Sequence, residues 1–292
     1  MAQPAVMLGL QLPDVDQWSE RVVVALGQNP GAFTGPGTNT YLVGTGRERV
    51  LLDTGQGLPA YLPVLERALD AAGGARIGEI VLTHGHPDHL GGVRGIRERH
   101  GPLRVSKRPW PAMDAAMGCE VTPIDDGAVI ETEGATLRAV HTPGHAEDHL
   151  CFMLEEERAL FSGDNVLGVG TTVIPTQGGD LDLYLRSLER LLEERPGTIY
   201  PAHGPRIADG VAKLREYLAH RHEREQQILA ALADGIERVP AIVRRIYAAY
   251  PEALHAAAGS SVASHLCKLL RERRVAQEES ADPLQARWRL LR

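Results

Sequence analysis

The chain is poor in cysteine: Cys119, Cys151 and Cys267 are the three cysteines among its 292 residues. They are odd in number, far apart in the sequence and outside any C-x-x-C pair. This pattern argues against a disulfide framework and against a thiolate zinc knuckle. We interpret the three side chains as small buried hydrophobic groups.

Long apolar runs are also missing. No uninterrupted stretch of about 18 apolar residues occurs, so the sequence predicts no membrane-spanning helix. The first residues, MAQPAVMLGLQLPDVDQW, lack both a basic flank and a long apolar segment, so no signal peptide is predicted. We therefore expect a cytoplasmic protein without a membrane partner. Aromatic residues make up only 4% of the chain, which counts against extensive base stacking.

What is present is enough apolar material for a large core. Hydrophobic residues make up 43% of the chain, which can form one large domain and a second, smaller unit. The net charge of −7 is unevenly distributed: residues 213–292 hold 14 Lys or Arg against 10 Asp or Glu, and residues 1–212 hold 17 against 28. The basic tail fits either a solvated helical surface or a surface for an anionic partner.

The pattern along residues 1–212 predicts strands alternating with helices. We expect strands at 21–26, 39–44, 49–55, 79–83, 103–107, 127–131, 135–141, 149–156, 158–163 and 198–201, and helices at 59–72, 93–100 and 181–195. Polar and histidine-rich segments follow several of the strands. This order is typical of an α+β protein with layered sheets and outer helices, and with catalytic groups on the loops.

After residue 212 the pattern becomes helical, and we place a second domain at 213–292. Helices are predicted at 212–235, 239–251 and 260–274, the last with a serine N-cap. Two short arms, 274–279 and 286–291, flank a turn. Three helices followed by a hairpin are the order expected of a winged helix-turn-helix, although a lid or a dimerisation element has the same pattern.

The strongest chemical signal is the segment THGHPDH at residues 83–89. His84 and His86 are two apart at a strand end and project to one side, whereas Asp88 and His89 lie where the chain turns into a helix. One segment can thus serve two metal ions. Further candidate ligands follow apolar strands elsewhere in the chain: His145 in HTPGHAEDH, Asp164 in FSGDN and His203 in YPAHGP.

The H-x-H-x-D-H segment, followed by TPGH, SGD and AHG, resembles the metallo-β-lactamase superfamily. The resemblance implies a four-layer αβ/βα sandwich and two zinc ions. His84, His86 and His145 would hold one ion, Asp88, His89 and His203 the other, and Asp164 would bridge them. These ligand types also suit manganese or iron. Asp88 would in addition orient a metal-bridged hydroxide, the expected nucleophile of a hydrolase.

Within this superfamily the sequence resembles the β-lactamase-like protein 2 branch still more closely, in NPGAFTGPGTNTYLVGTG, in SGDNVLGVGTTVI and in YPAHGPRI. Members of this branch resemble endoribonucleases that act on single-stranded RNA. The resemblance covers about residues 20–275, including the winged-helix-like tail.

Four further residues are candidates for supporting the metal ligands or contacting substrate. Asp53 and Thr83 are predicted to hydrogen-bond ligand imidazoles, or else to cap strand ends. His149 is either a partner of the ligands or a structural histidine, and Asn39 borders the pocket or forms a turn.

Three functions fit the sequence. The first, narrowly preferred, is a dinuclear zinc phosphodiesterase acting on single-stranded RNA, with Arg271, Arg273 and Arg274 as phosphate contacts. The second is hydrolysis of a small carbonyl substrate, namely a thioester, lactone or β-lactam. The third is a non-enzymatic nucleic-acid-binding protein, which the complete ligand set disfavours. The substrate and the oligomeric state are left open.

Overall fold

The computed structural model describes residue 7 and residues 9–291. Part of the N-terminal segment for which the sequence predicts no signal peptide, residues 1–6 and 8, lies outside the described residues. Within the described part, no helix combines the length and apolar character needed to cross a bilayer.

Two β-sheets form the centre of the molecule. The first has the order β1-β2-β3-β4-β5-β6-β7 and the second the order β12-β11-β10-β9-β8. The strands are β1 (Val15–Ser19), β2 (Val22–Leu26), β3 (Asn39–Val43), β4 (Glu48–Leu52), β5 (Arg76–Val81), β6 (Arg104–Lys107), β7 (Thr122–Pro123), β8 (Val129–Thr132), β9 (Ala135–His141), β10 (Leu150–Leu154), β11 (Ala159–Gly163) and β12 (Thr198–Pro201). The short edge strands β1 and β7 were not expected from the sequence.

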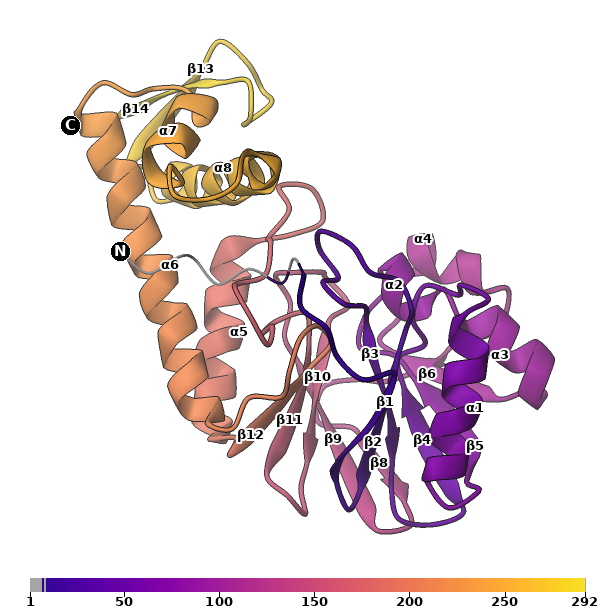
Figure 1. Ribbon diagram of the computed structural model, residues 1–292. Helices are drawn as coiled ribbons and strands as arrows, with labels where there is room; N and C mark the ends of the chain where they lie inside the picture. The colour runs from indigo at the N-terminus through magenta and orange to yellow at the C-terminus, as the bar shows by residue number, and fades with distance from the viewer. Residues whose placement is uncertain (1–6, 8, 292) are drawn as a thin grey trace.

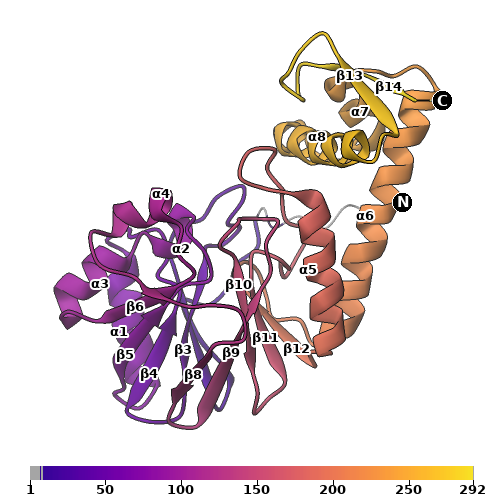
Figure 2. The same cartoon turned by 180° about the vertical axis from the view of Figure 1, so that it is seen from behind.

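The central strands β2, β3 and β4 of the first sheet are buried on both faces, whereas the edge strands β1 and β7 are half-buried or exposed. In β2, Val22 and Val24 face the core between the two sheets, whereas Val23 and Ala25 face the helices outside. Because side chains alternate along a strand, one apolar run supplies both layers. Helices α1 (Tyr61–Ala71) and α3 (Val93–His100) cover this sheet, and α5 (Leu181–Glu194) covers the second (Figure 1, Figure 2). The four-layer αβ/βα sandwich is confirmed.

Short helices occupy the loops at one end of the first sheet. They are α2 (Pro87–Leu90), α4 (Pro111–Asp114) and the 3-10 turn η1 (Ala115–Met117).

The C-terminal part consists of α6 (Gly210–Ala233), α7 (Val239–Ile246), η2 (Glu252–Leu254), α8 (His255–Arg271), β13 (Val275–Glu278) and β14 (Arg287–Leu290). The hairpin β13–β14 pairs antiparallel, and Trp288 from it is fully buried against the three helices. The winged-helix arrangement is confirmed. The serine N-cap predicted for the last helix is wrong: α8 begins at His255, so Ser260 and Ser261 lie inside it, and Ser261 packs near α6.

Helix α6 connects the two parts. Its first half supplies Leu214 and Tyr217 to the core beneath α5, and its second half supplies Ile228 and Leu232 to the C-terminal core. Figure 1 shows α7, α8 and the hairpin on the far end of α6, above the loops at the ends of the sheets. These loops carry the histidine-rich segments.

Candidate metal centre

The loops that follow β5, β9, β11 and β12 bring seven predicted ligands together. His84, His86, His145 and Asp164 offer ligand atoms that all lie within 4.8 Å of one another, and so do Asp88, His89 and His203. The two groups together contain every ligand proposed from the sequence: His84, His86, Asp88, His89, His145, Asp164 and His203.

Three imidazoles converge in the first group. His86 Nδ1 lies 2.9 Å from His84 Nε2 and 3.0 Å from His145 Nε2. Burial lowers the pKa of His84 well below its usual range, and it lowers the pKa of His145 to about 4. These rings are therefore neutral at pH 7, and neutral imidazole nitrogens are zinc ligands.

In the second group, the imidazoles of His89 and His203 both contact two carboxylates, Asp88 of the same group and Asp164. His203 Nε2 lies 3.3 Å from Asp88 Oδ2 and 3.1 Å from Asp164 Oδ1, and His89 Nε2 lies 3.5 Å and 3.4 Å from the same two atoms. Burial opposes the charged form of His203, but Asp164 raises its pKa to about 9. Burial also opposes ionisation of Asp88, but His89 and His203 lower its pKa to about 2. This side of the centre attracts positive charge.

Asp164 lies between the two groups. Its Oδ1 contacts His203, and its Oδ2 lies 3.4 Å from His145 Nε2. One carboxylate thus reaches both sets of ligands, as a bridging ligand requires.

The residues present fit a pair of metal ions. His89 Nε2 and Asp164 Oδ1 are buried and make no hydrogen bond with the described residues. Buried polar atoms without a hydrogen bond are costly, and an ion between them removes that cost. The set holds nitrogen and oxygen donors and no cysteine, which suits zinc and also iron or manganese.

Hydrogen bonds to the outer ring nitrogens orient the candidate ligands. His89 Nδ1 lies 2.8 Å from Asp53 Oδ2, His145 Nδ1 lies 3.0 Å from the Val173 carbonyl oxygen, and His84 Nδ1 lies 3.1 Å from Thr83 Oγ1. A proton on Nδ1 of each ring leaves the Nε2 lone pair facing the centre. Asp53 and Thr83 are thus placed beside ligand imidazoles, and Thr83 also donates to Asp53 Oδ1 through its backbone N–H.

His149 supports Asp164. The backbone N–H of Asp164 donates to His149 Nε2 at 3.1 Å, and His149 Nδ1 lies 2.9 Å from Thr142 Oγ1. Gly163 has a φ of 49°, and a Cβ there would lie 2.6 Å from His149 Nε2. Only glycine allows this close approach.

Asn39 lies next to the loop that carries His203. Its side chain donates to the carbonyl oxygens of Pro201 (2.9 Å) and Gly204 (2.8 Å) and is buried away from the cavity described below. These two hydrogen bonds position that loop.

Comparison with known proteins agrees with this architecture. Residues 33–203 match the family model of the metallo-beta-lactamase superfamily, and residues 239–288 match that of the beta-lactamase associated winged helix domain. The lactamase-like protein adaB of Aspergillus niger is 41% identical over 95% of this chain and 88% of its own length. The chain belongs to the metallo-beta-lactamase superfamily.

The chain is also similar to a thioesterase and to a protein of known crystal structure. An atrochrysone carboxyl ACP thioesterase of Claviceps purpurea is 43% identical over 76% of this chain and 68% of its own length. The crystal structure of a metallo-beta-lactamase family protein from Thermus thermophilus has a TM-score of 0.76 at 26% identity, covering 94% of this chain and 100% of that one. This metallo-beta-lactamase superfamily member is a hydrolase, as predicted. Its relatives do not support the endoribonuclease-like branch.

Several supporting groups had no signal in the sequence of this superfamily member. The Val173 carbonyl oxygen is a backbone atom, so no residue type marks it. Thr142 and Thr38 are single threonines in loops; Thr38 Oγ1 lies 3.4 Å from Asp88 Oδ2 and also accepts from Asn29 at 3.0 Å. Arg221 of α6 donates to the carbonyl oxygen of Thr172, the residue before Val173. These residues are 49 apart in the chain, so only the fold brings them together.

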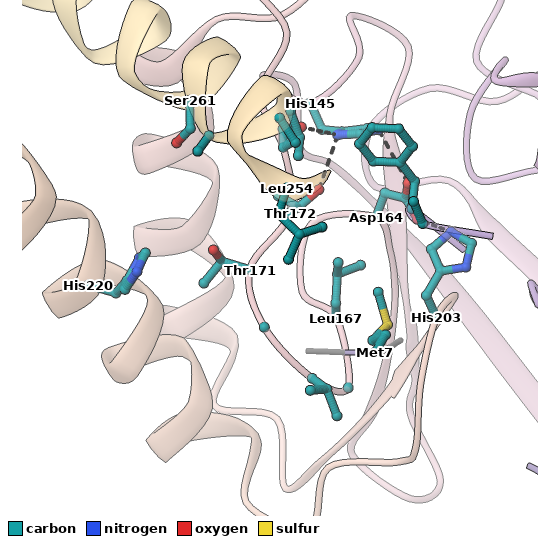
Figure 3. A pocket seen from close by; sticks show the side chains of 18 of the residues that line it. Met7, His145, Asp164, Leu167, Thr171, Thr172, His203, His220, Leu254 and Ser261 are labelled. Carbon is teal, nitrogen blue, oxygen red and sulfur yellow. Dashed lines mark hydrogen bonds and ion pairs between the residues drawn. The ribbon is translucent and has the colours of Figure 1, made fainter. Parts of the chain in front are cut away.

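A cavity of about 920 Å³ opens onto the centre. His86, Asp88, His145, Asp164 and His203 line one end of it. Figure 3 shows His145, Asp164 and His203 on one side of this cavity and His220 of α6 on the other. The other two candidate ligands, His84 and His89, are fully buried and do not line the cavity.

Proposed function

We propose that this chain hydrolyses a thioester with two metal ions, zinc being the first candidate. His84, His86 and His145 would hold one ion, and Asp88, His89 and His203 the other, with Asp164 between them. The ions would polarise the substrate carbonyl and supply a nucleophile at neutral pH by lowering the pKa of water to about 7. This proposal retains the second of the three sequence-based functions in preference to RNA cleavage.

The choice of a thioester as substrate rests on one observation. Relatives that are 43% identical to the chain are named as thioesterases. The charge of the cavity agrees with it. Among the described residues that line the cavity, Lys213 is the one lysine or arginine, whereas Asp88, Asp164, Glu216 and Glu223 are acidic. An RNA backbone binds through lysine and arginine, so this lining disfavours RNA.

The ion pairs of the tail arginines also disfavour RNA as a substrate. Arg271 pairs with Asp180 at 2.8 Å, and Arg274 pairs with Glu225 at 2.8 Å. These carboxylates compete with phosphate for two of the three arginines that the sequence marked as phosphate contacts.

In the proposed reaction, Asp88 and its neighbours act on water and on the carbonyl group. Thr38 Oγ1 and His203 Nε2 both contact Asp88 Oδ2, which fixes the carboxylate at the cavity wall. An ionised Asp88 accepts a hydrogen bond from the attacking water and orients it. The thiol leaving group has a pKa of about 8.5, so it departs as a thiolate with little need of a general acid.

The test is a substrate panel with the full-length, metal-loaded protein. We expect release of free thiol from an acyl-pantetheine thioester, and no cleavage of single-stranded RNA, a lactone or a chromogenic cephalosporin. Metal analysis of the active preparation would identify the ions. Cleavage of RNA without thioester hydrolysis would reverse the choice between the two substrates.

A further inference from the structure

The cavity extends well beyond the metal centre, and its far wall comes from the C-terminal part of the chain. This wall is formed by residues of α6, η2 and α8 and of the turn after α7, among them His220, Tyr247, Tyr250, Leu254, Ala257 and Ser261. In Figure 3, Ser261 and His220 lie on two helices on the side away from His203. The winged-helix domain therefore completes a cavity that begins at the catalytic loops.

Much of the cavity lining is apolar. Leu254 and Ala257 are half-buried at the start of α8, and the loop after Asp164 contributes Leu167 and Val173. Tyr247 and Tyr250 pack edge to face with ring centroids 5.3 Å apart. A volume of about 920 Å³ is at the upper end of the range for ligand pockets, so it accepts a group much larger than acetyl.

His220 places one polar group in the far wall. Arg224 Nη2 donates to His220 Nε2 at 3.4 Å, which leaves the ring proton on Nδ1. His220 Nδ1 is buried and makes no hydrogen bond with any described residue. Burial, with Arg221 and Arg224 nearby, lowers the pKa of His220 to about 4, so the ring is neutral. The ring is thus an N–H donor without an acceptor, on a residue that lines the cavity.

We propose that this cavity binds the acyl group of the substrate, an extended apolar chain or ring system that carries a ketone or hydroxyl oxygen, and that His220 donates from Nδ1 to that oxygen. The inference rests on the thioesterase activity proposed above. The thioester carbonyl then lies at the metal centre, and the acyl group extends between Leu167 and Val173 on one wall and Leu254 and Ala257 on the other. The oxygen supplies the acceptor that the protein lacks.

The first experiment tests His220 with a series of pantetheine thioesters: acetyl, octanoyl, and octanoyl with a ketone at successive carbons. In the wild-type protein we expect one ketone position to raise kcat/KM about tenfold over plain octanoyl, the effect of one hydrogen bond. His220→Phe removes this preference, and His220→Asn, which keeps an N–H donor, restores part of it. His222→Phe is the matched control, because His222 lies two residues along α6 and is exposed.

The second experiment tests the apolar wall. Ala257→Phe fills the cavity, so we expect the ratio of kcat/KM for octanoyl over acetyl to fall about tenfold. Ala256→Phe is the control, since Ala256 is exposed on the same turn of α8 and does not line the cavity. Circular dichroism and metal content check that each variant folds and keeps its ions.

The outcomes separate this inference from the proposed function. Hydrolysis of no thioester by the metal-loaded wild type would reject the thioesterase function. Hydrolysis of acetyl and octanoyl thioesters at equal rates, with no ketone preference and no effect of Ala257→Phe, would overturn the acyl site alone. Calorimetric binding of a non-hydrolysable octanoyl amide analogue gives a readout independent of turnover. Binding that Ala257→Phe weakens and Ala256→Phe does not would support the site.

Discussion

Arg221 of α6, the helix that connects the two parts of the chain, donates from Nη2 to the carbonyl oxygen of Thr172 at 2.6 Å. Thr172 belongs to the loop whose next residue, Val173, accepts from His145 Nδ1. Ser264 of α8 donates to the carbonyl oxygen of Ile174 in the same loop. The winged-helix part therefore holds the loop that orients one of the candidate metal ligands.

We predict that Arg221→Met weakens metal binding at the group containing His145. The substitution leaves the Thr172 carbonyl oxygen without its buried donor. Loss of a direct hydrogen-bond partner of a ligand lowers metal affinity by about 10- to 100-fold, and because Arg221 acts through the residue before Val173 we expect a smaller loss, about threefold to tenfold. Chelator competition followed by metal analysis measures the effect. Arg245→Ala removes an exposed ion pair with Asp234 and should leave affinity unchanged. Equal metal affinity in Arg221→Met and wild type would show that the contact only stabilises the fold.

Asp53→Asn tests the orientation of His89. Asp53 has a φ of 60°, a conformation that asparagine also tolerates, so the backbone should be retained. The amide replaces the carboxylate that accepts from His89 Nδ1, and we expect about 10- to 100-fold weaker binding of one ion. Isothermal titration of the metal-free protein resolves the two sites. An unchanged isotherm would mean that the Asp53 charge does not affect the ligand.

Asp88→Ala removes a proposed ligand and the group that orients water. We expect turnover to fall to background for every substrate, and the metal content of the purified protein to fall by one ion per chain. Asp125→Ala is a suitable control, because the Asp125 side chain is 85% exposed. Full turnover in Asp88→Ala would contradict the role assigned to this carboxylate.

His265 in α8 predicts a pH-dependent stability. It is buried, both ring nitrogens lack a hydrogen bond within the described part of the chain, and burial lowers its pKa well below the usual range. The charged groups near it, Arg221 and Arg224 from α6 and Lys268 from α8, lower the pKa further, and so does His220.

Because the unfolded state takes up the proton first, the contribution of His265 is fully present above about pH 6.5 and is lost as the pH falls below that value. His265→Leu should therefore flatten the fall of the free energy of unfolding between about pH 6.5 and pH 5, by at most about 1.4 kcal/mol per pH unit. Urea denaturation at several pH values measures the slope. Parallel curves for the variant and the wild type would refute this prediction.

The sequence by itself determined the class of the fold and the candidate ligands. The short apolar run of β2 is enough to predict a strand, and because strand side chains alternate in direction, such a run supplies apolar side chains to both faces. The segment from His84 to His89 marks a metal site because its ligand types are dense and local. The later ligands, such as His203, were recognisable because each follows an apolar strand. The start of α8 was predicted five residues too late, because tertiary packing buries Ser261 and Ser264 inside the helix.

Only the tertiary structure decided which atoms support the ligands and what shape the substrate cavity has. The Val173 carbonyl oxygen reaches His145, and Arg221 reaches Thr172, through contacts between segments distant in the chain. Backbone carbonyl oxygens have no residue signature, and the depth of a cavity depends on how α6 and α8 pack above the sheets. The preference for RNA came from the resemblance to the endoribonuclease-like branch and from the basic composition of the tail. The relatives of the chain do not support that branch, Arg271 and Arg274 pair with carboxylates in the folded protein, and the cavity lining is mainly apolar and acidic. Composition counts charges, whereas only the packed structure determines which of them face a ligand.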